Sequence, residues 1–334
     1  MRVGIMGVHY GHIQGMLSSA FAARNAEIVG VVEPNNAAYR KIGRFKDIPR
    51  FPTLPDMLEK ARPELLLEGC IHPEKTELVE LAASSGCHVL LDKPLCSGPS
   101  DWKRMWEAVE TYGIKLSMFF TSRTYPPFVA LRDSVLAGDL GEIISIVSTH
   151  PHRWGGVRPS WFFDDKSYAG TFHDLACHGV DWIRWLTGSE YTGVHAIAAC
   201  KKYTDPPLDD HAQASFQMSD GTCTVVTADW LTPDAATSWG DTRVIVMGSE
   251  GSAHLRAYTD NHVLVVSNKR GIYEPPLRDY KPQAFVQEMI AAIERGDEHF
   301  VSTEDVFAVA QACLIAEESA RQSGQFLPIS SESP

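Results

Sequence analysis

The chain has 334 residues, 44% of them hydrophobic and 22% charged, and its 30 Lys and Arg against 42 Asp and Glu give a formal net charge of −12. These proportions are typical of globular domains and exclude a disordered chain, a collagen-like chain and a coiled coil. At about 150 residues per domain, the length predicts two domains. The negative charge argues against nucleic acid as a partner. The class of protein that remains is an enzyme that acts on small molecules.

The N-terminus and the cysteines indicate the compartment. The first apolar run, residues 2–6, is too short for a signal peptide, and no run of about 18 apolar residues follows. The seven cysteines include no Cys-x-x-Cys pair, which favours free thiols in a reducing environment. We therefore expect a cytoplasmic protein that does not span a membrane.

The first third of the chain alternates strand and helix patterns. Strands are predicted over residues 2–6, 27–32, 64–67, 88–91 and 115–120. Helices are predicted over residues 12 to about 24, 35–45, 73–84 and 99–112. Short apolar strands that alternate with helices indicate a parallel sheet covered on both faces. With right-handed crossovers, this is a doubly wound α/β domain of the Rossmann type, which we place at residues 1–122.

A different pattern follows from residue 123. Helices are predicted over 126–137 and 172–186, a polar, aromatic loop over 150–168, and strands over 143–149, 195–203, 212–218, 222–229, 243–247, 253–256 and 262–267. This series predicts an α+β domain, residues 123–334, with a large, mostly antiparallel, open-faced sheet. Two closing helices, 282–295 and 303–323, can pack back on the first domain.

A glycine-containing turn, Gly7-Val8-His9-Tyr10-Gly11-His12, follows the first strand directly and opens the first helix. A dinucleotide fold places its phosphate loop there, because the N–H groups at the helix start attract an anion. The match to G-x-G-x-x-G is imperfect, since His9 and His12 stand where glycines are usual. We predict that Gly7, His9, Tyr10, Gly11 and His12 bind the cofactor.

Glu33 ends the second predicted strand. A carboxylate there can accept both ribose hydroxyls of an adenosine and would repel a 2′-phosphate. No Arg or Lys follows until Arg40, so NAD is favoured over NADP. A solvated carboxylate at a strand end is the alternative interpretation.

Two further patterns carry reactive groups. Asp92-Lys93-Pro94 ends the fourth predicted strand, where a parallel sheet borders its ligand, although a surface lysine before a turn also fits. Asp174 and His178 are four residues apart on a predicted helix, so the carboxylate can orient the imidazole and stabilise its protonated form. An ordinary pair on a helix surface is the alternative for the second pattern.

Taken in order, these motifs resemble the glucose–fructose oxidoreductase/inositol dehydrogenase family, called Gfo/Idh/MocA. The resemblance rests on Gly7 to His12, on Asp92-Lys93-Pro94, on the Gly-x3-Asp-x3-His pattern from Gly170 to His178, and on Leu140-Gly141-Glu142-Ile143 and the closing segment from Val301. It implies nicotinamide bound to the first domain, with Lys93 beside it, and a substrate held between the domains. It also implies catalytic roles: Lys93 and His178 contact the reacting hydroxyl, His178 moves the proton, and Asp174 holds His178.

The loop before the catalytic helix borders the substrate in similar proteins. Here it carries Arg153, Trp154, Arg158 and Trp161, and His173 lies beside Asp174. Indole rings stack on the C–H face of a polyhydroxylated ring, and guanidinium groups bond its oxygens or a carboxylate. A packed aromatic loop is the alternative. A metal held by His150, His152, His173 and His178 is a further option, but no Cys or dense ligand run supports it, so no metal is assigned.

The resulting expectation is an NAD(P)-dependent dehydrogenase that acts on the CH–OH group of a sugar or polyol. A redox-neutral enzyme of the same family, which cleaves glycosides or epimerises with tightly held NAD, is the alternative, and a non-catalytic nucleotide sensor is a third. We also expect a homodimer or homotetramer, because the outer face of the second sheet would leave Val225, Ile245 and Val265 exposed in a monomer.

Overall fold

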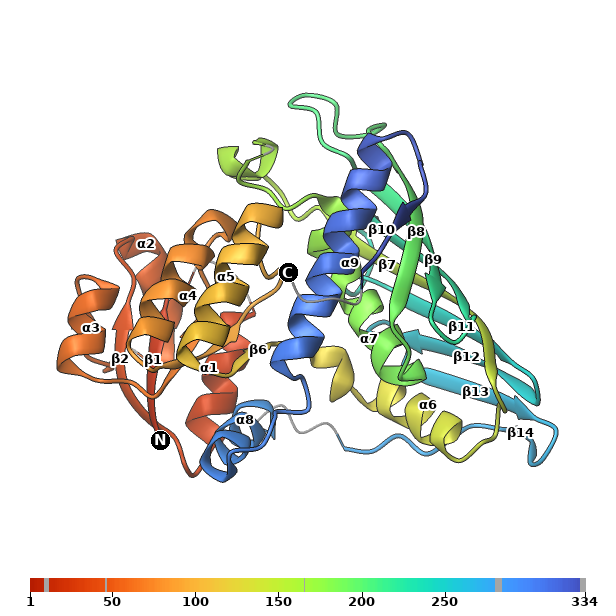
Figure 1. Cartoon of the computed structure of the whole chain (residues 1–334), viewed down its shortest axis with the longest axis horizontal. Helices are drawn as coiled ribbons and strands as arrows, with labels where there is room; N and C mark the ends of the chain where they lie inside the picture. The colour runs from red at the N-terminus through yellow and green to blue at the C-terminus, as the bar shows by residue number, and fades with distance from the viewer. Residues whose placement is uncertain (9–11, 46, 165, 280–283, 331–334) are drawn as a thin grey trace. The chain divides into compact units, whose positions relative to one another are not determined.

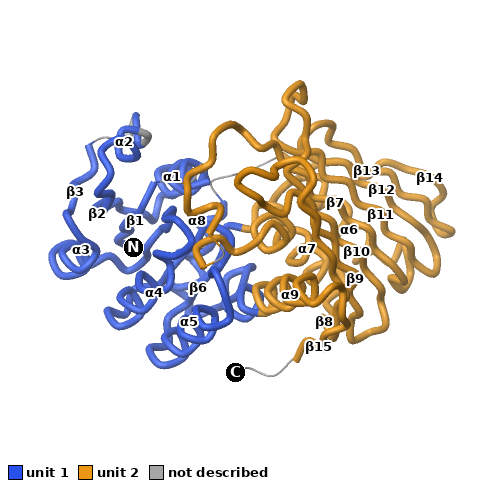
Figure 2. The backbone as a smooth tube through the Cα atoms, turned by 90° about the horizontal axis from the view of Figure 1, so that it is seen from above, with its two compact units in different colours: residues 1–119, 281–307 blue, residues 120–280, 308–334 orange. Residues whose placement is uncertain are grey.

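The computed structural model describes residues 1–8, 12–45, 47–164, 166–279 and 284–330. The chain divides into two compact units, residues 1–119 with 281–307 and residues 120–280 with 308–334 (Figure 2). None of the helices within the described ranges has the length and apolar character needed to cross a membrane.

Six parallel strands form the sheet of the first unit, in the order β3-β2-β1-β4-β5-β6. The strands are β1 (Arg2–Met6), β2 (Glu27–Val32), β3 (Arg50–Phe51), β4 (Leu65–Glu68), β5 (His88–Leu91) and β6 (Leu116–Met118). This order is the doubly wound Rossmann topology, whose switch point lies between β1 and β4. The predicted fold of this part of the chain is confirmed.

Helices cover both faces of this sheet (Figure 1). They are α1 (Ile13–Ala22), α2 (Asn36–Tyr39), α3 (Leu54–Lys60), α4 (Lys75–Ser84), α5 (Pro99–Tyr112) and α8 (Ala284–Arg295). Helix α8 comes late in the chain and packs on α1, where the Val286 N–H donates to the Ser19 hydroxyl at 3.0 Å. All four residues of β4 are buried, as expected for a parallel strand covered on both faces.

The second unit contains a nine-stranded sheet in the order β14-β13-β12-β11-β7-β10-β9-β8-β15. Its strands are β7 (Ile143–Arg153), β8 (Tyr191–Ala199), β9 (His211–Met218), β10 (Cys223–Thr232), β11 (Thr242–Gly248), β12 (Gly251–Ala257), β13 (His262–Ser267), β14 (Gly271–Tyr273) and β15 (Leu327–Pro328). Only the β7–β10 pairing among them is parallel. The predicted, mostly antiparallel sheet is therefore confirmed.

One face of this sheet is covered by helices α6 (Pro126–Leu136) and α7 (Cys177–Thr187) and by much of α9 (Thr303–Arg321) (Figure 1). On the other face, Val225, Val147 and Ile245 are cross-strand neighbours, and Val147 and Ile245 are each 40% exposed. Val225 is half-buried. The prediction that Val265 is exposed is wrong, because Val265 pairs with buried Ala253 on the covered face and is itself buried.

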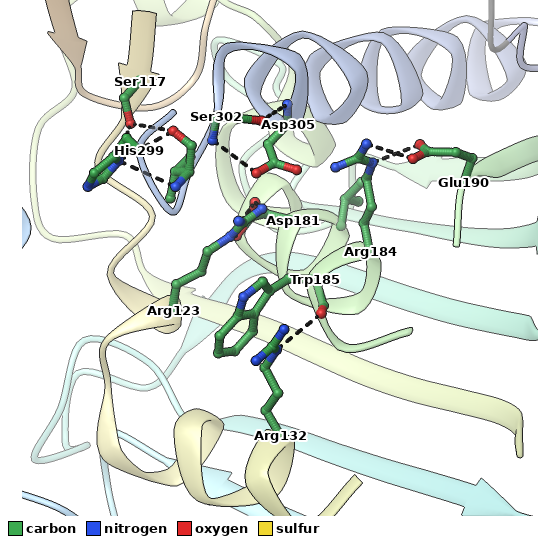
Figure 3. Close-up of polar contacts among 12 residues, drawn as sticks. Ser117, Arg123, Arg132, Asp181, Arg184, Trp185, Glu190, His299, Ser302 and Asp305 are labelled. Carbon is green, nitrogen blue, oxygen red and sulfur yellow. Dashed lines mark hydrogen bonds and ion pairs between the residues drawn. The ribbon is translucent and has the colours of Figure 1, made fainter. Parts of the chain in front are cut away.

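Ion pairs fix the helices of the second unit (Figure 3). Arg123 holds Asp181 of α7 in a buried pair, with Nη2 2.6 Å from Oδ1 and Nε 3.0 Å from Oδ2. Such a fork-shaped pair satisfies both planar groups in a site that excludes water. Arg132 lies over the ring of Trp185 and donates to its carbonyl oxygen, which ties α6 to α7.

Three differences from the predicted elements concern the site. Strand β7 runs to Arg153, so the predicted loop from residue 150 begins later. The predicted single helix over 172–186 starts with a π-helical turn, Phe172–Ala176, before α7 begins. Strand β3 and helix α3 were not predicted at all.

Candidate active site

The turn after β1 requires glycine at its first position. Gly7 has a φ of +75°, and a Cβ atom built there would lie 2.6 Å from Sγ of Cys70. The Gly7 N–H donates to the carbonyl of Val32 at 2.9 Å, which joins the ends of β1 and β2. The tight turn predicted from the sequence is therefore present, although His9, Tyr10 and Gly11 lie outside the described residues.

Glu33 lies at the end of β2 and is fully buried. Its Oε2 accepts the N–H of Val8 at 2.9 Å, and its Oε1 accepts the N–H of Asn35 at 2.8 Å. The carboxylate therefore supports the backbone of the glycine turn, a role that sequence reasoning missed. A carboxylate oxygen can accept more than one hydrogen bond, so these two contacts are compatible with the predicted role of Glu33 toward a ribose hydroxyl.

Arg50 is a second residue missed at this strand end. Its guanidinium donates to the carbonyl oxygens of Glu33 and Pro34 and lies 4.3 Å from the ring centre of Tyr39. It comes from β3, which pairs with the end of β2. The positive charge of Arg50 thus lies beside Glu33, although no basic residue is close to Glu33 in the sequence. A 2′-phosphate bound here would be repelled by Glu33 and attracted by Arg50.

Asp92, Lys93 and Pro94 follow β5, and the Asp92 and Lys93 side chains are buried. Oδ1 of Asp92 accepts the N–H of Lys93 at 2.7 Å and lies 2.8 Å from Nδ1 of His12. Burial opposes the charged form of Asp92, but His12 and Lys75 outweigh it and lower its pKa. Asp92 therefore remains an acceptor that orients His12 and the turn carrying Lys93.

In the second unit, the glycine just before the helix of Asp174 and His178 packs against a remote carboxylate. Gly170 has a φ of +91°, and a Cβ atom there would lie 2.2 Å from Oε1 of Glu317. That oxygen accepts the N–H groups of Phe172 at 2.9 Å and His173 at 3.1 Å. Burial raises the pKa of Glu317 to about 7, against the effect of these N–H groups. Glu317 therefore caps the first turn of this helix.

Asp174 lies within the π-helical turn Phe172–Ala176, and His178 follows in the first turn of α7. Asp174 is buried and its Oδ2 accepts the hydroxyl of Tyr168 at 3.1 Å. His178 is half-buried, with its ring edge-on to Phe120 at 5.8 Å between centroids. The arrangement is a fixed, buried carboxylate followed one turn later by a more accessible imidazole. His173, beside Asp174, is buried.

The predicted substrate loop forms an aromatic cluster around a guanidinium group. Arg158 lies 4.5 Å from the ring centre of Trp230, 4.9 Å from Phe162 and 5.0 Å from Trp154. Trp154 also stacks on Tyr203 at 4.1 Å. Arg158 and Trp154 therefore lie together. Tyr203 and Trp230 join them from positions 45 and 72 residues after Arg158 in the chain.

Arg153 and Trp161 take other positions. Arg153 donates to the backbone carbonyls of Ala236 and Ser238, the latter at 3.1 Å, and lies near the ring of Trp239. Trp161 packs on Phe162 at 5.1 Å. Arg153 therefore connects the end of β7 to the loop after β10. Some of its N–H groups are already engaged in these hydrogen bonds to the backbone.

The histidines offered as metal ligands have separate surroundings. His150 is buried and its Nε2 lies 2.8 Å from the Ser148 hydroxyl. Burial, with a smaller contribution from His152, lowers the pKa of His150 to about 3, so its ring is neutral. Within the described ranges, no three His, Cys, Asp or Glu side chains gather in a way that could hold a metal ion.

Comparison with known proteins gives matches along most of the chain. Residues 1–120 match the family model described as "Oxidoreductase family, NAD-binding Rossmann fold", and residues 128–254 match the "GFO/IDH/MocA C-terminal domain". Inositol 2-dehydrogenase of Rhizobium meliloti (strain 1021) is 28% identical over 262 residues, 74% of this chain and 76% of the relative. Rhizopine catabolism protein MocA of Rhizobium meliloti is 25% identical over 263 residues, 77% of this chain and 78% of the relative.

A solved structure also has the same fold. The complex of levoglucosan dehydrogenase with NADH and L-sorbose superposes with a TM-score of 0.86 at 19% identity, covering 99% of both chains. The family matches and the fold thus show an oxidoreductase with an NAD-binding Rossmann fold and a large second sheet. The chain belongs to the Gfo/Idh/MocA family, and the cofactor expected from the sequence, NAD, is confirmed.

Proposed function

We propose that the chain oxidises a secondary hydroxyl of a sugar or polyol, or catalyses the reverse reaction, with NAD as the hydride carrier. The observation that carries this proposal is the buried carboxylate of Asp174 one turn before the accessible imidazole of His178. An imidazole held in this way can take the hydroxyl proton as the C–H bond breaks. Names of relatives support the substrate class, since they include an inositol dehydrogenase and a levoglucosan dehydrogenase.

In this proposal each residue has a separate task. His178 removes the hydroxyl proton, and Asp174 orients its ring and stabilises the imidazolium that forms. Lys93 contacts the same hydroxyl and stabilises the developing alkoxide. Bound NAD supplies the hydride acceptor. Gly7, His9, Tyr10, Gly11, His12, Glu33 and Lys93 would bind it.

The aromatic cluster would hold the sugar. Arg158 offers donors for the oxygens of a polyol, and Trp154 beside it stays a proposed contact for the C–H surface, while buried Trp230 supports both side chains. Trp161 and His173 stay proposed substrate contacts. Arg153 is also a proposed substrate contact, through its other N–H groups, because Nη2 already donates to the carbonyl oxygens of Ala236 and Ser238.

The test is a panel of sugars, inositols and sugar acids, with NADH followed at its absorbance maximum and products separated by chromatography. NADH that accumulates with a polyol and is absent with Asp174→Asn and His178→Ala would support the proposal. Product formed without net NADH would instead support the redox-neutral glycoside-cleaving or epimerising reaction. NAD binding with no product from any member would contradict both reactions.

The organisation of the chain is part of the proposal. We assign residues 1–122 to cofactor binding and residues 123–334 to substrate binding and assembly. Seven cysteines that form no disulfide support a cytoplasmic location. The exposed row of Val147, Ile245 and Met247 supports a homodimer or homotetramer. Light scattering that gave a monomer at micromolar concentration would contradict the assembly, and Ile245→Lys should shift an oligomer toward monomer.

A further inference from the structure

A buried ion pair lies between the ends of two strands in the first unit. Glu68 is the last residue of β4, Lys75 is the first residue of α4, and both side chains are fully buried. Lys75 Nζ lies 3.2 Å from Oε2 of Glu68. The ammonium also donates to the carbonyl oxygens of Asp92 at 2.5 Å and Pro94 at 2.9 Å. Three acceptors match the three N–H bonds of an ammonium group, so the lysine is fully used.

Glu68 completes the contacts to the same turn. Its Oε2 accepts the N–H of Asp92 at 3.1 Å, and its Oε1 accepts the N–H of Cys70. The pair thus binds the N–H and C=O of Asp92 and the C=O of Pro94, the backbone groups on either side of Lys93. Cys70 is also the residue against which Gly7 packs, so the pair supports the glycine turn as well.

Stability alone does not account for this pair. Removing two charges from water costs free energy that their attraction only partly offsets, and apolar side chains of similar volume often stabilise a core as well or better. Burial raises the pKa of Glu68 to about 7 although Lys75 opposes this shift. The pair makes hydrogen bonds to the backbone around Lys93, and apolar side chains could not make them.

We propose that Glu68 and Lys75 are positioning residues, which fix the backbone on both sides of Lys93 so that its ammonium group is held in place for the substrate. This inference rests on the proposed role of Lys93 at the reacting hydroxyl. It assigns functions to two residues that neither touch the substrate nor belong to a recognised motif.

The main variant replaces the pair by apolar side chains, Glu68→Leu with Lys75→Met, which leaves no lone buried charge. We expect a folded protein with the circular dichroism of the parent, because the volumes are similar. Its kcat should fall by about 10- to 100-fold, since a displaced catalytic group costs that order in rate. The exposed pair of Asp56 and Lys60 is the matched control, and Lys60→Met should leave kcat unchanged.

A double-mutant cycle separates positioning from general damage. In a Lys93→Ala background the apolar pair should lower kcat by less than about twofold, because its effect acts through Lys93. An equal loss in both backgrounds, or an unchanged kcat in the Lys93-containing protein, would overturn the inference. If Lys93→Ala is itself fully active, the proposed role of Lys93 fails first, and the inference fails with it.

A second measurement needs neither substrate nor cofactor. Hydrogen exchange read by mass spectrometry should show faster exchange in a peptide covering residues 91–96 of the apolar variant, since the Asp92 amide loses its acceptor. Peptides from the second unit should be unchanged. If the double replacement does not fold, Glu68→Gln keeps an oxygen acceptor and the volume, and should show a smaller increase in the same peptide. Parent-like exchange there in either variant would contradict the inference.

Discussion

The hydroxyl of Tyr168 donates a hydrogen bond to Oδ2 of Asp174 at 3.1 Å, inside a buried environment. Tyr168 is itself held by its ring, which stacks on Phe162 with centroids 4.2 Å apart. The carboxylate proposed to orient His178 is therefore oriented in turn by a tyrosine six residues earlier. Such supporting hydrogen bonds set the geometry of a catalytic base.

Tyr168→Phe should test this support with little change in packing. The ring stays on Phe162, and only the donor to Asp174 is lost. We expect kcat to fall about three- to tenfold, with a stability loss of about 1 kcal/mol, the usual net value of one hydrogen bond. Steady-state kinetics and urea unfolding give the two numbers. An unchanged kcat would mean that Asp174 keeps its orientation without the tyrosine.

Replacing His178 should separate chemistry from cofactor binding. We expect His178→Ala to lower kcat by about 10²- to 10⁴-fold, the usual contribution of a general acid–base, while NAD affinity stays nearly constant. Lys93→Ala should affect both KM and kcat, because its charge serves the bound substrate and the transition state. NAD titrations and kinetics on variants with parent-like circular dichroism decide this. A folded His178→Ala protein with near-normal turnover would show that His178 is structural.

Glu33 should control the choice between NAD and NADP. Glu33→Ser removes the negative charge that repels a 2′-phosphate, while Arg50 stays beside the same strand end. We therefore expect weaker NAD binding and stronger NADP binding than in the parent, measured by calorimetry with both dinucleotides.

Glu33→Gln is the matched control for the contacts of this side chain to the backbone. It keeps an oxygen acceptor for the glycine turn but loses the charge, so it should lose selectivity with less loss of stability than Glu33→Ser. If both variants lose stability and keep the parent ratio of NAD to NADP affinity, Glu33 acts only on the turn. Tighter binding of NADP than NAD by the parent would overturn the predicted preference.

The sheet of the first unit could be predicted closely because its strands are short apolar runs between turns. The predicted bounds of β1, β2 and β5 agree with the structure. Strand β3 has only two residues, Arg50 and Phe51, and forms by pairing with β2. A segment of that length has no periodicity of its own, so no pattern could reveal it, and Arg50 was missed with it.

The site shows the same limit. Gly170, Asp174 and His178 form a local motif, which the sequence displays directly. The π-helical turn that contains Asp174 begins with N–H groups that donate to Glu317, which is 147 residues after Gly170 and meets it only in the folded chain. Trp230 was missed for a related reason, because an inward-facing tryptophan of a strand looks like core until Arg158 is seen against its ring.

Glu317 should give the stability of the protein a specific pH dependence. Its pKa rises from an ordinary 4.5 to about 7 on folding, chiefly through burial. The folded state therefore binds this proton more tightly than the unfolded state, and its stability falls as pH rises through the window from about 4.5 to 7. Above pH 7 this contribution is constant. Glu317→Gln keeps an oxygen for the N–H groups of Phe172 and His173 but has no proton to lose.

The variant should therefore gain stability relative to the parent as pH rises from 5 to 8, by on the order of 2–3 kcal/mol. Urea unfolding followed by circular dichroism at several pH values measures the difference. Glu318 is the matched control on the same helix, since hydrogen bonds from Gln322 and Arg321 lower its pKa. Glu318→Gln should show no gain with rising pH. A difference between Glu317→Gln and the parent that stays constant from pH 5 to 8 would mean that Glu317 ionises normally in the folded protein, and that its burial beside Phe172 and His173 does not perturb its pKa.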